Sequence, residues 1–100
     1  MTSEATTLTV RDDRERSRFE AVDADGAVAA FSEYLRHDDR IVFTHTEVDP
    51  AYEGRGVGST LVRQALDEVR ATDLRVVATC PFVKAWIARH PSYGDLLTRP

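Results

Sequence analysis

Several features that are common in proteins are scarce or absent in this chain of 100 residues, and each absence excludes a class of structure. The single cysteine, Cys80, has no second cysteine with which to form an internal disulfide. No apolar run approaches the roughly 20 residues that a membrane-spanning helix needs. The first residues, Met1 to Glu4, have neither the basic nor the apolar segment of a secretory signal, so we expect a cytoplasmic protein that does not enter a membrane.

Positive charge is also limited, with 13 basic against 17 acidic residues and a net charge of −4. No basic stripe runs through the sequence, so nucleic acid is not expected as a partner. The three histidines are scattered, and no metal site is predicted from them. Hydrophobic residues make up 42% of the chain, which is an ordinary globular value, and the length predicts a single domain over residues 1–100.

The hydrophobic pattern predicts four strands followed by a helix, a strand and a helix. Residues 27–35 fit either a helix or a strand, but the turns on both sides of them favour a strand. The expected strands are 8–12, 17–23, 27–35, 41–48 and 74–79. The expected helices are Gly54 to about Thr72 and Pro81 to Arg89, with a short helix or turn at 91–97.

This order has a consequence for the sheet. Consecutive strands joined by tight turns pair antiparallel, whereas two strands joined through a crossover helix run parallel. We therefore expect a mixed α+β fold of order ββββαβα(α). Its sheet is mostly antiparallel, with a parallel pair formed by the fourth and fifth strands.

The run from Glu53 to Gly58, with glycines at alternate positions, carries the most information. It joins a strand to a helix, and glycines before the free amides of a helix N-terminus favour anion binding. A dinucleotide-binding loop would need a third glycine where Ser59 stands, and a Walker A loop would need a lysine. Ser59 excludes the first loop, and the second is excluded because the only lysine in the chain is Lys84.

The same run resembles the (Gln/Arg)-x-x-Gly-x-(Gly/Ala) loop of the GNAT acetyltransferases, which cradles the pyrophosphate of coenzyme A. Residues 43–48, 80–82 and 90–93 match in the same order, and the chain resembles the small branch of about one hundred residues that lacks the usual N-terminal helices. The resemblance implies a GNAT-like fold and acetyl-CoA as cosubstrate. Glu53 stands where Gln or Arg is usual, so we expect its side chain to point away and its amide alone to matter.

The resemblance also implies which residues hold the cofactor. Main-chain amides of the loop would bind the pyrophosphate, with charge added by Arg55 or Arg63, and the strand before the loop would pair with the pantetheine. The predicted cofactor-binding residues are Val48, Glu53, Gly54, Arg55, Gly56, Val57, Gly58, Ser59, Thr60, Cys80 and Phe82.

On the fourth strand, His45 and Glu47 are two residues apart and are expected on one face, with Val42, Thr44, Thr46 and Val48 on the other. A histidine and a carboxylate on one face suit a base that deprotonates an amine. The competing interpretation is a solvated polar pair or a structural hydrogen bond. In the resembling branch this segment faces the acyl end of the cofactor, which favours a catalytic role.

Cys80 and Tyr93 are the remaining catalytic candidates. A thiol just before a helix N-terminus favours the thiolate, although a free cysteine is more often a small buried apolar residue. Cys80 is considered as the acid for the leaving thiolate, as an acyl-accepting nucleophile, or as a residue that forms a mixed disulfide with CoA. Tyr93 resembles the tyrosine that often protonates the sulfur in GNAT enzymes, but it equally fits packing over the core.

The predicted function is transfer of an acetyl group from acetyl-CoA to a primary amine by direct attack, the usual course in the superfamily. The acceptor is a small-molecule or protein amine. One alternative is a non-catalytic CoA- or acyl-CoA-binding module, because the missing N-terminal helices leave the acceptor side open. A second alternative is an interaction domain whose glycine loop holds no ligand.

Overall fold

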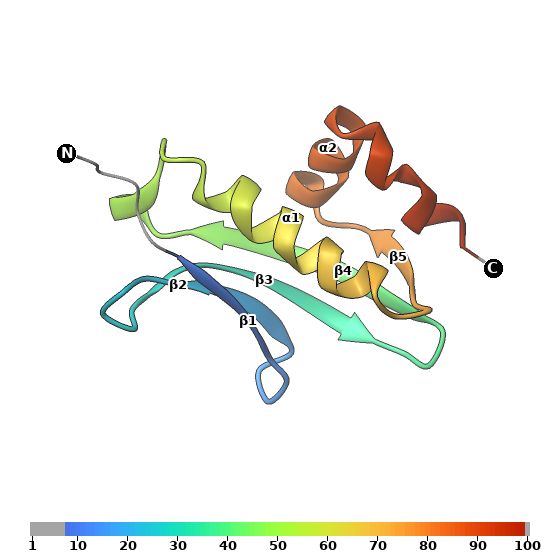
Figure 1. Ribbon diagram of the computed structural model, residues 1–100, viewed down its shortest axis with the longest axis horizontal. Helices are drawn as coiled ribbons and strands as arrows, with labels where there is room; N and C mark the ends of the chain where they lie inside the picture. Colours follow the sequence, from blue (N-terminus) through green and yellow to red (C-terminus); the bar gives the residue numbers. More distant parts are fainter. Residues whose placement is uncertain (1–7, 100) are drawn as a thin grey trace.

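Five strands form one sheet in sequence order, β1-β2-β3-β4-β5, in the computed structural model, which describes residues 8–99 (Figure 1). The first four pair antiparallel, and β5 pairs parallel to β4. The strands are β1 (Thr9–Asp13), β2 (Arg18–Val22), β3 (Val28–Arg36), β4 (Arg40–Val48) and β5 (Arg75–Ala78). The predicted fold class and the parallel pair are confirmed, and residues 27–35 are confirmed as mostly strand.

Apart from a 3₁₀ turn before the glycine run, which we did not predict, the helices follow the predicted order. They are the 3₁₀ turn η1 (Pro50–Tyr52), α1 (Val57–Arg70), α2 (Pro81–Arg89) and the 3₁₀ segment η2 (Pro91–Thr98). Helix α1 crosses one face of the sheet, which we call the inner face, and α2 lies beside α1 at the β5 edge (Figure 1). None of the helices within residues 8–99 is both long enough and apolar enough to span a membrane. Met1 to Glu4 lie outside the described residues.

The core lies between the inner face and one stripe of α1. Every third or fourth residue of α1 is apolar and buried, which is the spacing of a helix that packs on one side. The strands supply aromatic side chains to the same layer, and α2 adds Trp86 at one end. The largest members of this core are Phe19, Tyr34, Ile41, Phe43, Leu61, Leu66, Trp86 and Leu96.

A bulge in β4 alters the predicted alternation of its side chains. Tyr34 pairs with Phe43 but the preceding Glu33 pairs with His45, so Thr44 is an extra residue on β4. The extra residue reverses the alternation beyond it. Thr46 and Val48 therefore share the inner face with Ile41 and Phe43, not with Val42 as we expected. His45 and Glu47 lie together on the opposite face, which we call the outer face, as predicted.

Helix α1 begins three residues later than predicted, at Val57 and not at Gly54. Gly54 and Gly56 have φ angles of 81° and 75°, in the left-handed region that does not fit a right-handed helix. The sequence from Glu53 to Gly56 is therefore a turn that aims the first amides of α1, and the left-handed conformation explains why glycine is needed at both positions.

Replacing Leu61 with alanine should lower the free energy of unfolding by about 2–5 kcal/mol, because its side chain, on the sheet-facing side of α1, is fully buried. The matched control is Leu35→Ala on the outer face. Leu35 is 57% exposed, so its loss should change stability by less than about 0.5 kcal/mol. Urea denaturation of both variants measures the difference, and equal losses would contradict the assignment of the two faces.

Candidate functional site

The β4–β5 pair comes apart at a defined point. Its last register pair is Phe43 with Ala78, and the next two N–H groups, of Thr79 and Cys80, both donate to the carbonyl of Phe43 at 3.1 and 3.0 Å. The chain then turns into α2. The edge of β4 from Thr44 to Val48 therefore continues without a β5 neighbour, and an opening forms between β4 and the start of α2.

A cavity of about 430 Å³ lies at this opening. Strand β4 contributes two inner-face side chains, the glycine loop and the first turn of α1 form a second wall, and α2 contributes one aromatic ring. The lining residues are Thr46, Val48, Tyr52, Glu53, Gly54, Gly56, Val57, Gly58, Ser59 and Phe82. Eight of the predicted cofactor-binding residues therefore line one cavity: Phe82 and seven residues of β4 and the glycine loop. Thr60 and Arg55 are sequence neighbours of lining residues.

The N-terminus of α1 presents free hydrogen-bond donors to this cavity. The N–H of Thr60 makes the first intrahelical bond, to the carbonyl of Gly56 at 3.0 Å. No side chain caps the helix and no acidic residue stands in its first turn. Within residues 8–99, the N–H groups of Val57, Gly58 and Ser59 have no acceptor. Together with the helix dipole, these three donors give the N-terminus of α1 an environment that favours an anion.

The expectation for Glu53 needs a correction. Its N–H already donates to the carbonyl of Pro50 at 3.3 Å, closing the η1 turn, and so is not free for a phosphate. The donors of the loop begin further along the chain, at the first residues of α1.

Gly58 allows α2 to approach α1 closely. A Cβ at this position would lie 2.7 Å from Cζ of Phe82 and 3.2 Å from Cγ2 of Val48. One residue along, the hydroxyl of Ser59 accepts a hydrogen bond from Nε1 of Trp86 at 2.8 Å. These contacts fix α2 against the loop and place the Phe82 ring, 39% exposed, at the rim of the cavity.

Tyr52 lines the cavity and was not among the predicted site residues. Its hydroxyl donates to Asp23, in the β2–β3 turn, and the guanidinium of Arg55 lies 5.7 Å from its ring centroid. The hydrogen bond to Asp23 raises the pKa of Tyr52 and, from the other side, lowers the pKa of Asp23. The β2–β3 hairpin, distant in sequence, therefore holds Tyr52 and with it one wall of the cleft. The only sequence signal for this role was an aromatic residue just before the glycine run.

His45 and Glu47 form a hydrogen-bonded pair, with Nε2 of His45 2.7 Å from Oε2 of Glu47. The side chains are 52% and 60% exposed on the outer face, so solvent or a ligand reaches both. His45 also lies beside Phe31, with ring centroids 6.3 Å apart. The pair sits on the stretch of β4 that has no β5 neighbour, one residue to either side of Thr46, which lines the cavity.

Cys80 is buried and stands one contact away from the cavity. Its thiol lies 3.4 Å from Oγ1 of Thr46, and that hydroxyl is 2.9 Å from Oγ of Ser32. Cys80 is also the N-cap residue of α2. Thr46, a residue that our site prediction left out, therefore connects the thiol to the space between β4 and α2.

Tyr93 lies elsewhere. Its ring packs edge-on against Trp86, and its hydroxyl donates to Oδ1 of Asp67 at 2.8 Å. The hydrogen bond to Asp67 raises the pKa of Tyr93, so the phenol holds its proton more firmly. Asp67 is nine residues beyond Gly58 along α1, roughly 14 Å at the rise of an α-helix. The structure does not bring Tyr93 together with His45 and Glu47.

No group of three or more His, Cys, Asp or Glu side chains in the described part of the chain is placed to hold a metal ion. The donors at the cavity are instead backbone amides and hydroxyls, with the exposed Arg55 next to them in sequence. This chemistry fits a phosphate-containing organic ligand.

Comparison with known proteins agrees with this geometry. The family model described as GCN5-related N-acetyl-transferase matches residues 18–96. Protein NATD1 of Mus musculus is 35% identical over 88 residues, covering 84% of this chain and 77% of that protein. Protein NATD1 of Bos taurus is 43% identical over 47 residues, a match that spans only 42% of the cattle protein.

A GCN5-like protein from Staphylococcus aureus, solved by NMR, has a similar fold. The TM-score is 0.65 at 24% identity, over 94% of this chain and 89% of that one. The family match extends from β2 into η2 and includes β4, the glycine loop and the cleft. The chain described here therefore belongs to the GCN5-related N-acetyltransferase family.

Proposed function

We propose that this protein is an N-acetyltransferase that moves the acetyl group of acetyl-CoA to a primary amine by direct attack. The observation that carries the proposal is the set of unpartnered N–H groups at the start of α1, which open onto the 430 Å³ cavity beside the free edge of β4. An anion site and an unpaired strand edge, joined in one cleft, suit a ligand with a diphosphate at one end and amides along its length.

The diphosphate of CoA would accept hydrogen bonds from the amides of Val57, Gly58 and Ser59. Arg55 is exposed next to these donors and would add positive charge. The amides of the pantetheine arm would pair with the free backbone of β4 near Val48, as an added strand does. Phe82 would then form the side of the cleft opposite β4.

The reaction needs a base and a proton for the leaving thiolate. An unperturbed amine has a pKa near 10, so a base must remove its proton before the nitrogen attacks the thioester carbonyl. Glu47 or His45 takes that proton, the C–N bond forms and the C–S bond breaks. Cys80, whose thiol contacts the hydroxyl of Thr46, would protonate the sulfur of CoA, and the second proton that the nitrogen loses as the amide forms would restore the Cys80 thiol.

The anion site is tested by a matched pair of substitutions at Gly56. Asparagine and aspartate both tolerate the left-handed conformation there better than other residues, and they differ by one charge. Gly56→Asp should weaken CoA binding by about tenfold relative to Gly56→Asn, because its carboxylate faces the diphosphate. Isothermal titration calorimetry with CoA measures both affinities, and equal affinities for the two variants would argue against a diphosphate at this turn.

The base is tested by Glu47→Gln and His45→Gln. Replacing the side chain that acts as the base should lower kcat by about 10²-fold, with little change in the affinity for acetyl-CoA. Glu33→Gln is the control, because Glu33 faces His45 from β3 on the same outer face. Turnover is measured as the rate at which free CoA is formed from acetyl-CoA and an amine. If neither variant lowers this rate more than the control does, neither side chain of the pair is the base. Wild-type protein that binds acetyl-CoA without transfer to any amine would support the binding-module alternative.

A further inference from the structure

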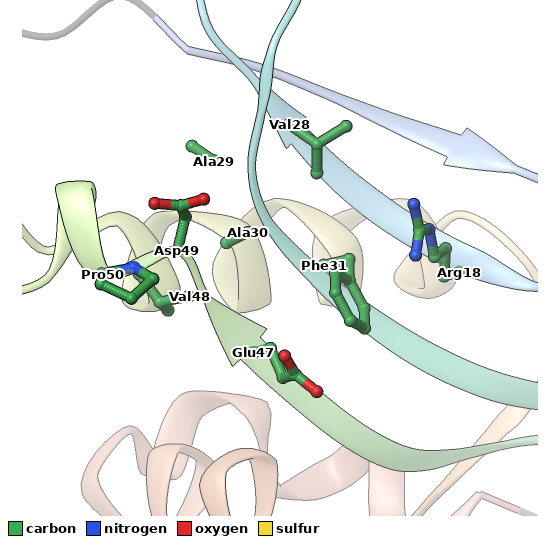
Figure 2. A pocket seen from close by; sticks show the side chains of 9 residues that line it. All are labelled: Arg18, Val28, Ala29, Ala30, Phe31, Glu47, Val48, Asp49 and Pro50. Atoms are coloured by element: carbon green, nitrogen blue, oxygen red, sulfur yellow. The ribbon is translucent and has the colours of Figure 1, made fainter.

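A second cavity, of about 280 Å³, lies on the outer face of the sheet, across β4 from the cofactor cleft. It follows the β3–β4 pair toward η1, and Figure 2 shows its side chains. The lining residues are Arg18, Val28, Ala29, Ala30, Phe31, Glu47, Val48, Asp49 and Pro50. Val48 belongs to the lining of both cavities, and Glu47 belongs to the proposed base pair, so the second cavity adjoins the first across β4 and contains one of the two candidate bases.

One end of this cavity is cationic. The guanidinium of Arg18 lies 4.4 Å from the ring centroid of Phe31, and its Nε donates to Oε2 of Glu20 at 2.7 Å. Glu20 is almost fully buried and also binds Arg11 at 2.8 Å. Two arginines thus share one carboxylate, which leaves a positive charge uncompensated within this trio. Glu33 is the register partner of Arg18, but the two make no ion pair in the described structure.

The other end is anionic. Glu47 lines it with a carboxylate that is 60% exposed, and only its Oε2 contacts His45. Asp49 lies beyond it, where its Oδ1 accepts the N–H of Ala51. Both acids therefore keep an oxygen without a partner in the described residues.

An apolar surface separates the two ends. Phe31 lies between Arg18 and Glu47 in Figure 2, and Val28 stands beside it. Arg18 is on β2 and Glu47 on β4, so their backbones are two strand spacings apart, about 10 Å, and are also offset by two residues along the strands, about 7 Å. A ligand that touches both ends must place opposite charges several bonds apart along an apolar body.

We propose that this outer-face cavity is the acceptor site, and that it selects a small amine whose carboxylate lies several bonds from the ammonium group. This proposal rests on the proposed acetyltransferase function. The amine would sit at Glu47, where it can be deprotonated, the spacer would cover Phe31, and the carboxylate would reach Arg18. A diamine would place its second cation against Arg18, and an α-amino acid is too short to span the two ends.

Three amines of equal length test the selection: 6-aminohexanoate, hexylamine and 1,6-diaminohexane. Binding of each is measured by amide chemical shifts in NMR titrations of the protein without acetyl-CoA. We expect 6-aminohexanoate to bind about fivefold more tightly than hexylamine and to shift the amides of Phe31 and Glu47, while 1,6-diaminohexane binds most weakly. Equal affinities, or a preference for the diamine, would overturn the proposal.

Arg18→Met and Arg11→Met form a matched pair, because each removes one of the two cations that bind Glu20 and only Arg18 lines the cavity. Arg18→Met should abolish the preference for 6-aminohexanoate over hexylamine, and Arg11→Met should retain it. Loss of the preference in both variants would mean that Arg18 does not contact the acceptor. If Arg18→Met does not fold, the amine series on the wild-type protein decides alone.

These outcomes are separable from a failure of the proposed function. CoA titrated into the same sample reports on the amides of the glycine loop, independently of the outer face. Selective amine binding without any CoA binding would refute the proposed acetyl transfer and leave the zwitterion site in place. CoA binding and acetyl transfer without selectivity among the amines would refute the zwitterion site and leave the proposed acetyl transfer in place.

Discussion

The carbonyl of Phe43 is the point on which the arrangement of this protein depends. It accepts two N–H groups from the end of β5, and beyond it β4 and β5 no longer pair. In a parallel pair this stop leaves polar backbone groups of β4 without their strand neighbour, and such groups need another partner. The apolar core beneath them continues through α1 and α2, so the sheet can open at this edge without losing the packing that holds it together.

The bulge at Thr44 determines which side chains of β4 point to each face of the sheet. Before it, Ile41 and Phe43 face α1 and belong to the core; after it, Thr46 and Val48 take the inner face, and His45 and Glu47 face outward. One strand thereby lines the cavity beside the glycine loop with one set of side chains and the outer-face cavity with the other. Two ligands approaching from opposite sides would meet at the free edge of a single strand.

Much of this could be predicted from the sequence, for physical reasons. Periodicity and turn residues predicted the element order, because burial of one face leaves a regular pattern, and the alternate glycines located the turn before α1. The extra residue at Thr44 was missed, because a bulge is set by strand pairing and leaves no local signal. Tyr52 and Arg18 were missed for a related reason. Their roles depend on Asp23 and on Glu20 with Phe31, partners that only the folded sheet brings near.

The hydrogen bond between Trp86 and Ser59 has a practical consequence. Trp86 is the only tryptophan in the chain, and its indole N–H is bound to the residue that carries the third free amide of α1. Indole emission depends on the polarity and hydrogen bonding around the ring. The protein therefore contains a single tryptophan fluorophore directly behind the turn that precedes α1, and a ligand bound at that turn would be followed by tryptophan emission without attaching a label.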